Sequence, residues 1–281
     1  MQYTTFDLSV ADHIARVTFN RPEQRNTMTL AFWPEIRHLF TALNERTDVR
    51  VVILASTGKH FTTGLDLRDF AVLGADLMTG DRGRSSERFR RLVLTMQESF
   101  TAIERCRVPV LAAIQGGCIG GGVDMVSACD MRYCTTDAFF CIHEINIGMT
   151  ADVGTLQRLP HLIPQGVARE LAYTGRRLSA ARALEVGLVN SIHPSHEALL
   201  AEVDVLAREI AQRSPLAIVG TKEMLNYTRD HSVADSLNYV ATWNAGMFFT
   251  SDVAEQMTAN AEKRAPQFPE LLPQRKLADG L

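Results

Sequence analysis

The stretch QGGCIGGGVDMVSACD, residues 115–130, joins a buried strand pattern to a helical pattern through five glycines. Glycine is favoured where a backbone turns sharply or comes close to another group. The triplet Gly120–Gly122 leads directly into apolar residues at helical spacing, so free backbone N–H groups are expected at a helix N-terminus. The helix dipole favours negative charge there, which predicts a site for an anion or a developing oxyanion. Tight packing of the helix against the strand is the simpler alternative.

A second glycine segment, GKHFTTGLDLRDF (58–70), follows the strand pattern VVILAS (51–56). Here Gly64 precedes Leu65 and the acid Asp66. If one backbone N–H from each glycine segment converged on the same oxygen, the pair would form an oxyanion hole. This segment alone is also consistent with a loop in which Asp66 is a cap. The first segment has neither the GxGxxG spacing of a Rossmann turn nor the Lys-Ser/Thr of a Walker A loop.

The stretch HEINIGMTADVGTLQRLP (143–160) places two carboxylates among apolar and small residues. Glu144 and Asp152 are its only acids, and neither belongs to a charged face. Apolar surroundings raise the pKa of a carboxyl group, which suits proton transfer near neutral pH. Asp152 is also suited to cap a helical run that starts at Val153. We expect His143 to be a packed or hydrogen-bonded histidine rather than a base.

Strand and helix patterns alternate over the first two thirds of the chain, which indicates an α/β class. The polar, turn-rich stretch 74–88 is expected to be a mobile surface loop. The expected strands are 13–19, 51–56, 108–114 and 130–135, and the expected helices surround Trp33–Leu43 and Phe89–Ile103.

From Leu178 onward the pattern becomes helical. One amphipathic run covers 198–213, and the last helical run reaches Arg264. We therefore expect an α/β core over residues 1–195 and a helical oligomerisation region over residues 196–281. The apolar faces of that region need a partner surface, which predicts a trimer-based oligomer.

Composition argues against several functional classes. The formal charge of -3 and the pI near 6.2 offer no basic field for nucleic acid. The chain starts without the features of a signal peptide, and no uncharged run reaches the ~20 residues of a membrane span, so we expect a cytoplasmic protein with no membrane partner. Five cysteines without a CxxC pair or metal-ligand spacing indicate reduced core thiols and no metal site.

These segments together resemble a known family. HFTTGLDL (60–67) and GGCIGGGVDM (116–125), with NRPEQRNTM (20–28) before and TGRRLSAARALEVGLVNSI (174–192) after, are similar to the crotonase, or enoyl-CoA hydratase/isomerase, superfamily. The resemblance covers nearly the whole chain. It implies a crotonase-type spiral of ββα repeats with a helical C-terminal trimerisation region, assembled as a homotrimer or homohexamer. Within the superfamily, GGCIGGGVDMVSACDMRYCTTDAFF, ADVGTLQRLP and RDHSVADSLNYVATWN resemble the delta-3,5,delta-2,4-dienoyl-CoA isomerases.

The resemblance assigns the reaction centre to five residues. It implies that the backbone N–H groups of Leu65 and Gly121 are the oxyanion donors. Asp124 and Glu144 stand where hydratases carry two glutamates. Asp152 matches an acid that is typical of the dienoyl isomerases, whereas hydratases usually have a glycine there. Both departures from the hydratase pattern, at Asp124 and Asp152, favour the isomerase.

The resemblance also implies a CoA thioester as the substrate. Its CoA-binding candidates are Arg25, Lys59, Thr63 and Arg68, although Glu23 replaces a lysine that is frequent in the family. CoA would be part of the substrate, so no separate cofactor is expected.

Shifting the double bonds of a 3,5-dienoyl thioester to the 2,4 positions, a step of fatty-acid β-oxidation, removes a proton from C2 and adds one at C6. These carbons lie further apart than the ~3 Å reach of one carboxylate, so two acids are needed. By resemblance, Asp152 acts at C2, Glu144 acts at C6, and Asp124 orients or polarises. A hydratase, in which two acids hold one water at C2 and C3, is the alternative. A non-catalytic CoA- or RNA-binding scaffold fits poorly, because all three acids are present.

Overall fold

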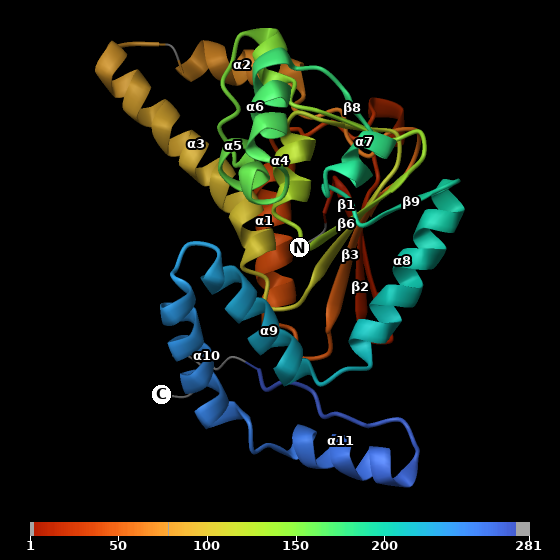
Figure 1. Cartoon of the computed structure of the whole chain (residues 1–281). Helices are drawn as coiled ribbons and strands as arrows, with labels where there is room; N and C mark the ends of the chain where they lie inside the picture. Colours follow the sequence, from red (N-terminus) through yellow and green to blue (C-terminus); the bar gives the residue numbers. More distant parts are fainter. Residues whose placement is uncertain (1–2, 78, 274–281) are drawn as a thin grey trace.

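The computed structural model describes residues 3–77 and 79–273 (Figure 1). Its centre is a six-stranded sheet with the order β1-β2-β3-β4-β6-β9, parallel except for the β1–β2 hairpin. β3 and β4 are buried along their whole length, as parallel strands covered on both faces must be. All four strands that the sequence predicts are present in this sheet. Its members are β1 (Phe6–Ala11), β2 (Ile14–Phe19), β3 (Val51–Ser56), β4 (Val110–Ile114), β6 (Met131–Thr135) and β9 (Ser191–His193).

A smaller sheet has the order β5-β7-β8. It consists of β5 (Gly117–Ile119), β7 (Phe139–Cys141) and β8 (Leu178–Ser179). β5 follows directly on β4, and β7 follows on β6, so consecutive strands contribute to different sheets. β5 then leads into α4 (Gly121–Ser127), which completes a ββα unit. This arrangement confirms the α/β class.

Helices cover both faces of the large sheet (Figure 1). On one face, α1 (Phe32–Glu45) and α3 (Arg82–Glu104) enclose the main apolar core. On the other face, α8 (His196–Ala211) inserts Leu199 and Val203 into a second apolar cluster formed with the strands. The expected boundary at residue 195 therefore falls one helix too early, because α8 is part of the sheet's covering layer.

The stretch 74–88, which the sequence led us to expect as a mobile loop, is largely helical. α2 (Leu67–Leu77) covers its beginning, and α3 starts at Arg82. Asp81 is the N-cap of α3 and accepts a hydrogen bond from the Arg84 backbone N–H at 3.0 Å. The polar residues of this stretch mark the exposed start of a long helix and its cap, a pattern that resembles a loop in sequence.

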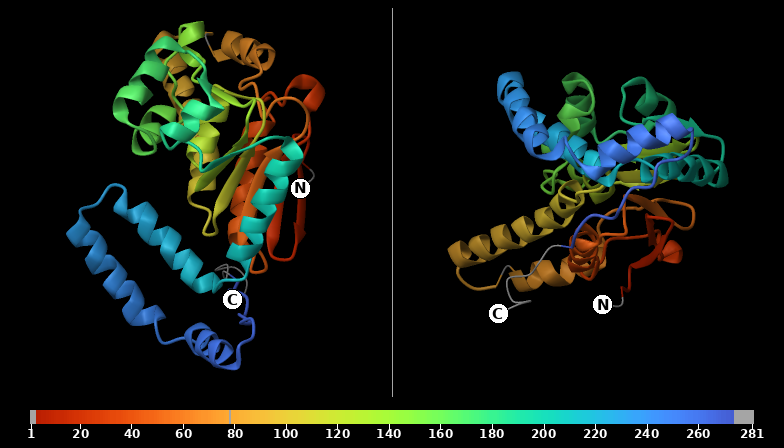
Figure 2. Two further views of the ribbon diagram at one scale, coloured as in Figure 1. Left: turned by 45° about the vertical axis from the view of Figure 1, so that its right-hand side comes forward. Right: turned by 90° about the horizontal axis from the view of Figure 1, so that it is seen from below.

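The last three helices project from the core as an arm (Figure 2). α9 (Pro215–Thr228) and α10 (Val233–Met247) form a helical hairpin, and α11 (Ser251–Glu262) follows. Lys222 on α9 anchors the arm, because its Nζ lies 2.7 Å from Asp130 Oδ2 next to the large sheet.

All five cysteines are buried and unpaired, as the composition indicates. No helix within residues 3–77 and 79–273 is both long and apolar enough to cross a membrane. The shorter helices that complete the described chain are η1 (Pro22–Gln24), η2 (Glu144–Ile147), α5 (Thr155–Arg158), η3 (Leu159–His161), α6 (Gln165–Thr174) and α7 (Ala180–Glu185).

The first prediction concerns the packing of α4. A Cβ at Gly122 would lie 2.6 Å from Thr62 Cγ2 and 3.2 Å from Cys118 Sγ. We expect Gly122→Ala to lower the free energy of unfolding by about 1–3 kcal/mol, measured by urea denaturation, because the core has no room for the methyl group. Gly246→Ala on the exposed face of α10, where a Cβ meets nothing within 4 Å, is the control and should be neutral or stabilising. Equal effects at both positions would contradict the close contact.

Candidate active site

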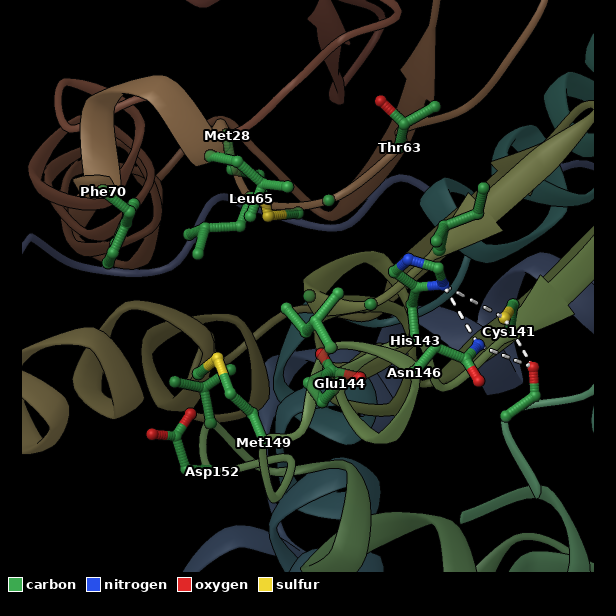
Figure 3. Close-up of a pocket in the computed structure, with 18 of the residues that line it drawn as sticks. Met28, Thr63, Leu65, Phe70, Cys141, His143, Glu144, Asn146, Met149 and Asp152 are labelled. Atoms are coloured by element: carbon green, nitrogen blue, oxygen red, sulfur yellow. Dashed lines mark hydrogen bonds between the residues drawn. The ribbon is translucent and has the colours of Figure 1, made fainter. Parts of the chain in front are cut away.

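A cavity of about 510 Å³ opens between the two glycine segments, the helices α1 to α3 and the segment around η2 (Figure 3). Most of its wall is apolar, and a small number of polar groups face into it, as is usual for small-molecule sites. Six of the nine residues that the sequence analysis assigned to the site line this cavity: Arg25, Thr63, Leu65, Gly121, Glu144 and Asp152.

Backbone hydrogen bonds join the two glycine segments. The Thr62 N–H donates to the Gly117 carbonyl at 3.1 Å, and the Ile119 N–H donates to the Thr62 carbonyl at 3.1 Å. The segments come so close that a Cβ at Gly64 would lie 2.7 Å from the Ile119 carbonyl oxygen. The absence of a side chain at Gly64 therefore permits this contact.

Two backbone N–H groups at the cavity are left without a hydrogen-bond partner in the described chain. Met28 bridges the residues around Leu65, because its N–H donates to the Gly64 carbonyl and its carbonyl accepts from the Asp66 N–H. Leu65 itself and Gly121, the first residue of α4, have no hydrogen-bond partner for their N–H groups among the described residues. Both residues line the cavity. Both N–H groups are thus available to a bound group in the cavity.

Glu144 lies next to the second glycine segment. A Cβ at Gly120 would be 3.2 Å from Glu144 Oε1, so the carboxylate is adjacent to the start of α4. Its Oε2 is buried, and within the described chain it has no hydrogen-bond partner. Burial, and then the carboxylate of Asp152, raise the pKa of Glu144.

Asp152 faces the same cavity from the segment that follows η2. Its backbone carbonyl accepts a hydrogen bond from Gln97 Nε2 on α3 at 2.7 Å, which fixes this segment against the helix. Burial raises the pKa of Asp152. It is not the cap of a helix, because α5 has Gly154 at its N-cap. Figure 3 shows Asp152 on the side of Phe70 and Glu144 between Asp152 and His143.

Asp124 lies behind the cavity wall. Its side chain is fully buried, and its Oδ1 accepts a hydrogen bond from the Thr155 backbone N–H at 2.6 Å. Its Oδ2 has no partner among the residues described. Burial raises the pKa of Asp124 to about 7, and the Glu144 carboxylate adds to this shift while the hydrogen bond from Thr155 opposes it. Asp124 therefore contacts the segment that carries Asp152, and the cavity lining does not include it.

His143 is held by hydrogen bonds, as the sequence analysis expected. Asn146 Nδ2 lies 3.1 Å from the Gly175 carbonyl and 3.3 Å from His143 Nδ1. Because an amide nitrogen only donates, His143 Nδ1 accepts, and a neutral ring carries its proton on Nε2.

The CoA-binding candidates divide into two groups. Arg25 and Thr63 line the cavity, and the Thr63 N–H donates to the Arg25 carbonyl at 3.1 Å. Lys59 and Arg68 are exposed and do not line it, and Arg68 forms an ion pair with Asp66 at 3.6 Å.

Sequence reasoning missed Arg177. Its guanidinium lies 4.2 Å from the ring centroid of Phe139, and both residues line the cavity. No local signal distinguishes Arg177 from a solvated surface arginine, because Phe139 lies far from it in sequence and only the β7–β8 pairing brings them together. No three His, Cys, Asp or Glu side chains within the described ranges are grouped as they would be around a metal ion.

Comparison with known sequences identifies relatives of the whole chain. A family model described as enoyl-CoA hydratase/isomerase matches residues 10–271. The chain is 46% identical over 257 residues to the mitochondrial delta(3,5)-delta(2,4)-dienoyl-CoA isomerase of Mus musculus. The alignment covers 91% of this chain and 79% of the relative. It is 45% identical over 259 residues to the peroxisomal delta(3,5)-delta(2,4)-dienoyl-CoA isomerase of Arabidopsis thaliana, covering 92% of this chain and 93% of the relative.

Solved structures share the fold. The enoyl-CoA hydratase of Bacillus anthracis superposes with a TM-score of 0.85 at 31% identity, over 94% of this chain and 99% of that one. The enoyl-CoA hydratase of Mycobacterium smegmatis gives a TM-score of 0.83 at 25% identity, over 94% and 98% of the two chains. These matches confirm the crotonase-type fold with its helical C-terminal region.

The second prediction concerns the buried carboxyl of Asp124. Its pKa is about 7 in the folded protein and about 3.9 in the unfolded chain. Between these two pH values the folded protein holds a proton on Asp124 that the unfolded chain has lost. This contribution to stability is complete below about pH 4 and is lost as the pH rises through about 7. We expect Asp124→Asn to gain stability relative to the parent protein over this interval, by up to roughly 4 kcal/mol.

Urea denaturation at several pH values measures this difference. Glu209→Gln, which alters an exposed carboxylate on α8, is the control and should show a nearly constant difference from the parent. A flat difference for Asp124→Asn as well would show that Asp124 has no raised pKa.

Proposed function

The chain belongs to the enoyl-CoA hydratase/isomerase family, and on that premise we propose that it converts 3,5-dienoyl-CoA thioesters to 2,4-dienoyl-CoA thioesters. The observation that carries this proposal is the presence of two carboxylates, Glu144 and Asp152, in one apolar cavity next to two free backbone N–H groups. The relatives named dienoyl-CoA isomerases at 45–46% identity support the isomerase over the hydratase.

The thioester carbonyl binds at the N–H groups of Leu65 and Gly121. Loss of a C2 proton turns the substrate into a dienolate, and the negative charge collects on this oxygen. Each donor of an oxyanion hole typically contributes ~3 kcal/mol to the stabilisation of such a charge. Gly121 is the first residue of α4, so the positive end of the helix dipole adds to this stabilisation.

We assign Glu144 to C2 and Asp152 to C6, which reverses the order taken from the family resemblance. Glu144 is packed against Gly120, so it is adjacent to the N–H group of Gly121 that would hold the carbonyl. C2 is bonded directly to the carbonyl carbon and therefore lies within reach of Glu144. Asp152 lies further along the cavity, toward Phe70 (Figure 3), where C6 would follow.

The reaction is a proton exchange at the two ends of the diene. Glu144 in its ionised form takes the C2 proton, the electrons move through the conjugated system, and protonated Asp152 donates to C6. Burial raises the pKa of both carboxyl groups, which makes each easier to protonate than an exposed carboxyl. Exchange with solvent then restores the starting protonation state.

The position of Asp124 argues against hydration. In a hydratase of this fold, Asp124 and Glu144 would together hold one water. Asp124 does not line the cavity, and its Oδ1 already accepts the Thr155 N–H. We propose instead that it positions the segment that carries Asp152.

For the CoA moiety we propose Arg25 and Thr63 at the cavity, with Lys59 and Arg68 on the adjoining surface. Arg177, stacked over Phe139, adds a cation at the cavity wall. No additional cofactor or metal has a role in this reaction.

The third prediction tests the two acids. Asp152→Asn and Glu144→Gln should each lower kcat for 3,5-dienoyl-CoA by about 10²-fold or more, the usual size of a general acid-base contribution, with little change in the affinity for acyl-CoA esters. The conjugated product is followed by its absorbance. Hydration of 2-enoyl-CoA, measured in parallel, should be slow in the parent protein, and hydration faster than isomerisation would favour the hydratase.

Deuterium exchange in D₂O separates the roles of the two acids. Asp152→Asn should still exchange the C2 proton of the substrate, because Glu144 is intact, while forming little product. Glu144→Gln should lose both exchange and product. The opposite pattern would restore the order implied by the resemblance.

The fourth prediction concerns assembly, for which we propose a homotrimer or a homohexamer. Several large apolar side chains on the arm are exposed in the single chain, among them Leu225, Leu237 and Met257 at 70%, 63% and 66%. Such a surface usually marks a protein interface. Sedimentation equilibrium should give a multiple of three times 31.2 kDa at micromolar concentration. A stable monomer would contradict the proposal.

A further inference from the structure

A second cavity, of about 360 Å³, adjoins the reaction cavity on the side of α1 to α3. Trp33, Phe70 and Met96 line both cavities. These three side chains therefore face both spaces, and we call them the partition. The other residues of the second cavity are Leu30, Pro34, Arg37, His38, Leu92, Thr95 and Ser99.

Trp33 is the side chain of the partition that is held in place by its neighbours. Trp33 is 5% exposed and packs against Phe32 and Phe100, with ring centroids 5.3 Å away in both cases. Its backbone carbonyl also accepts a hydrogen bond from Ser99 Oγ at 2.9 Å. These contacts hold the indole in place.

Met96 is the adaptable member. It lies on α3 and is buried between the two cavities. Methionine is unbranched and has three rotatable bonds, so it changes shape at low cost. A movement of Met96 would therefore change the boundary between the two spaces.

The reaction geometry points the acyl tail at the partition. The thioester is held at Leu65 and Gly121, and carbons beyond C6 continue past Asp152. Figure 3 shows Phe70 on the opposite side of the cavity from Thr63, so the CoA end and the partition lie at different ends. The cavity wall near the partition is apolar, with Phe89 and Val93 from α3.

We propose that the second cavity binds the distal part of long acyl chains and that Met96, against Trp33 and Phe70, is the gate that determines chain length. The inference rests on the proposed function, because it takes an acyl-CoA as the ligand. It adds the substrate class: dienoyl-CoA esters whose saturated tail exceeds the reaction cavity. Leu30, Pro34 and Leu92 supply the apolar surface for that tail.

Two variants test the gate from opposite directions. Thr95→Trp fills the second cavity from an exposed position on α3 that does not line the reaction cavity. Met96→Ala opens the partition. Leu94→Trp is the matched control, because Leu94 is exposed on the same helix and lines neither cavity.

The readout is calorimetric binding of octanoyl-CoA and hexadecanoyl-CoA, saturated esters that bind without reacting. Thr95→Trp should weaken hexadecanoyl-CoA binding by about tenfold or more, the effect of roughly two methylenes left unburied, and leave octanoyl-CoA binding unchanged. Met96→Ala should raise the preference for the long ester. Leu94→Trp should behave as the parent protein with both esters.

Equal weakening of both esters by Thr95→Trp, or no difference between Thr95→Trp and Leu94→Trp, would overturn the gate. Isomerase turnover is measured separately on the same proteins. A long-chain binding defect in a protein that never isomerises 3,5-dienoyl-CoA would support the acyl site and refute the proposed reaction. Turnover of short and long dienoyl-CoA in an unchanged ratio across all variants would refute the gate and leave the reaction standing.

Discussion

The close approach of the two glycine segments is the constraint on which the site depends. Gly64 and Gly122 lack the side chains that would otherwise collide with the Ile119 carbonyl and with Thr62. Beside the pairing of Thr62 with Cys118, the N–H groups of Leu65 and Gly121 have no hydrogen-bond partner within residues 3–77 and 79–273. Because Leu65 and Gly121 line the cavity, these N–H groups are available to a ligand there.

The low-dielectric surroundings of the site also raise the pKa values of its acids. Glu144 and Asp152 face the cavity, and burial raises the pKa of each. Asp124 is shifted most, to about 7, yet it contacts the Thr155 N–H behind the wall. A large pKa shift therefore does not by itself identify the group that reacts. Access to the cavity distinguishes Glu144 and Asp152, which line it, from Asp124, which contacts the segment that carries Asp152.

The polar and the apolar parts of the cavity come from different parts of the fold. The sheet ends and glycine turns supply the fixed polar groups, whose positions depend on backbone hydrogen bonds. Helices α1 to α3 supply the apolar end, where side chains such as Met96 can change shape without disturbing the backbone. If the proposed function holds, changes in these helices would alter the acyl-chain preference without moving the backbone N–H groups of Leu65 and Gly121.

The sequence by itself determined the local elements of this protein. Strand runs such as VVILAS (51–56) and the glycine-to-helix turn at Gly120–Gly122 are specified by short-range pattern and backbone sterics, and they were predicted correctly. The pairing of Glu144 with Asp152 was also readable, because both acids interrupt one apolar stretch. The stretch 74–88 was misread, because an exposed helix start and a loop use the same polar residues.

Only the tertiary structure decided what depends on contacts between distant segments. It placed α8 on the sheet, Asp124 behind the cavity and Arg177 over Phe139. It also put Glu144 against Gly120, the observation from which the order of the two acids along the substrate is proposed. Burial, electrostatic coupling and the partition between two cavities arise when separate elements pack together, and no short-range pattern in the chain encodes the distance between them.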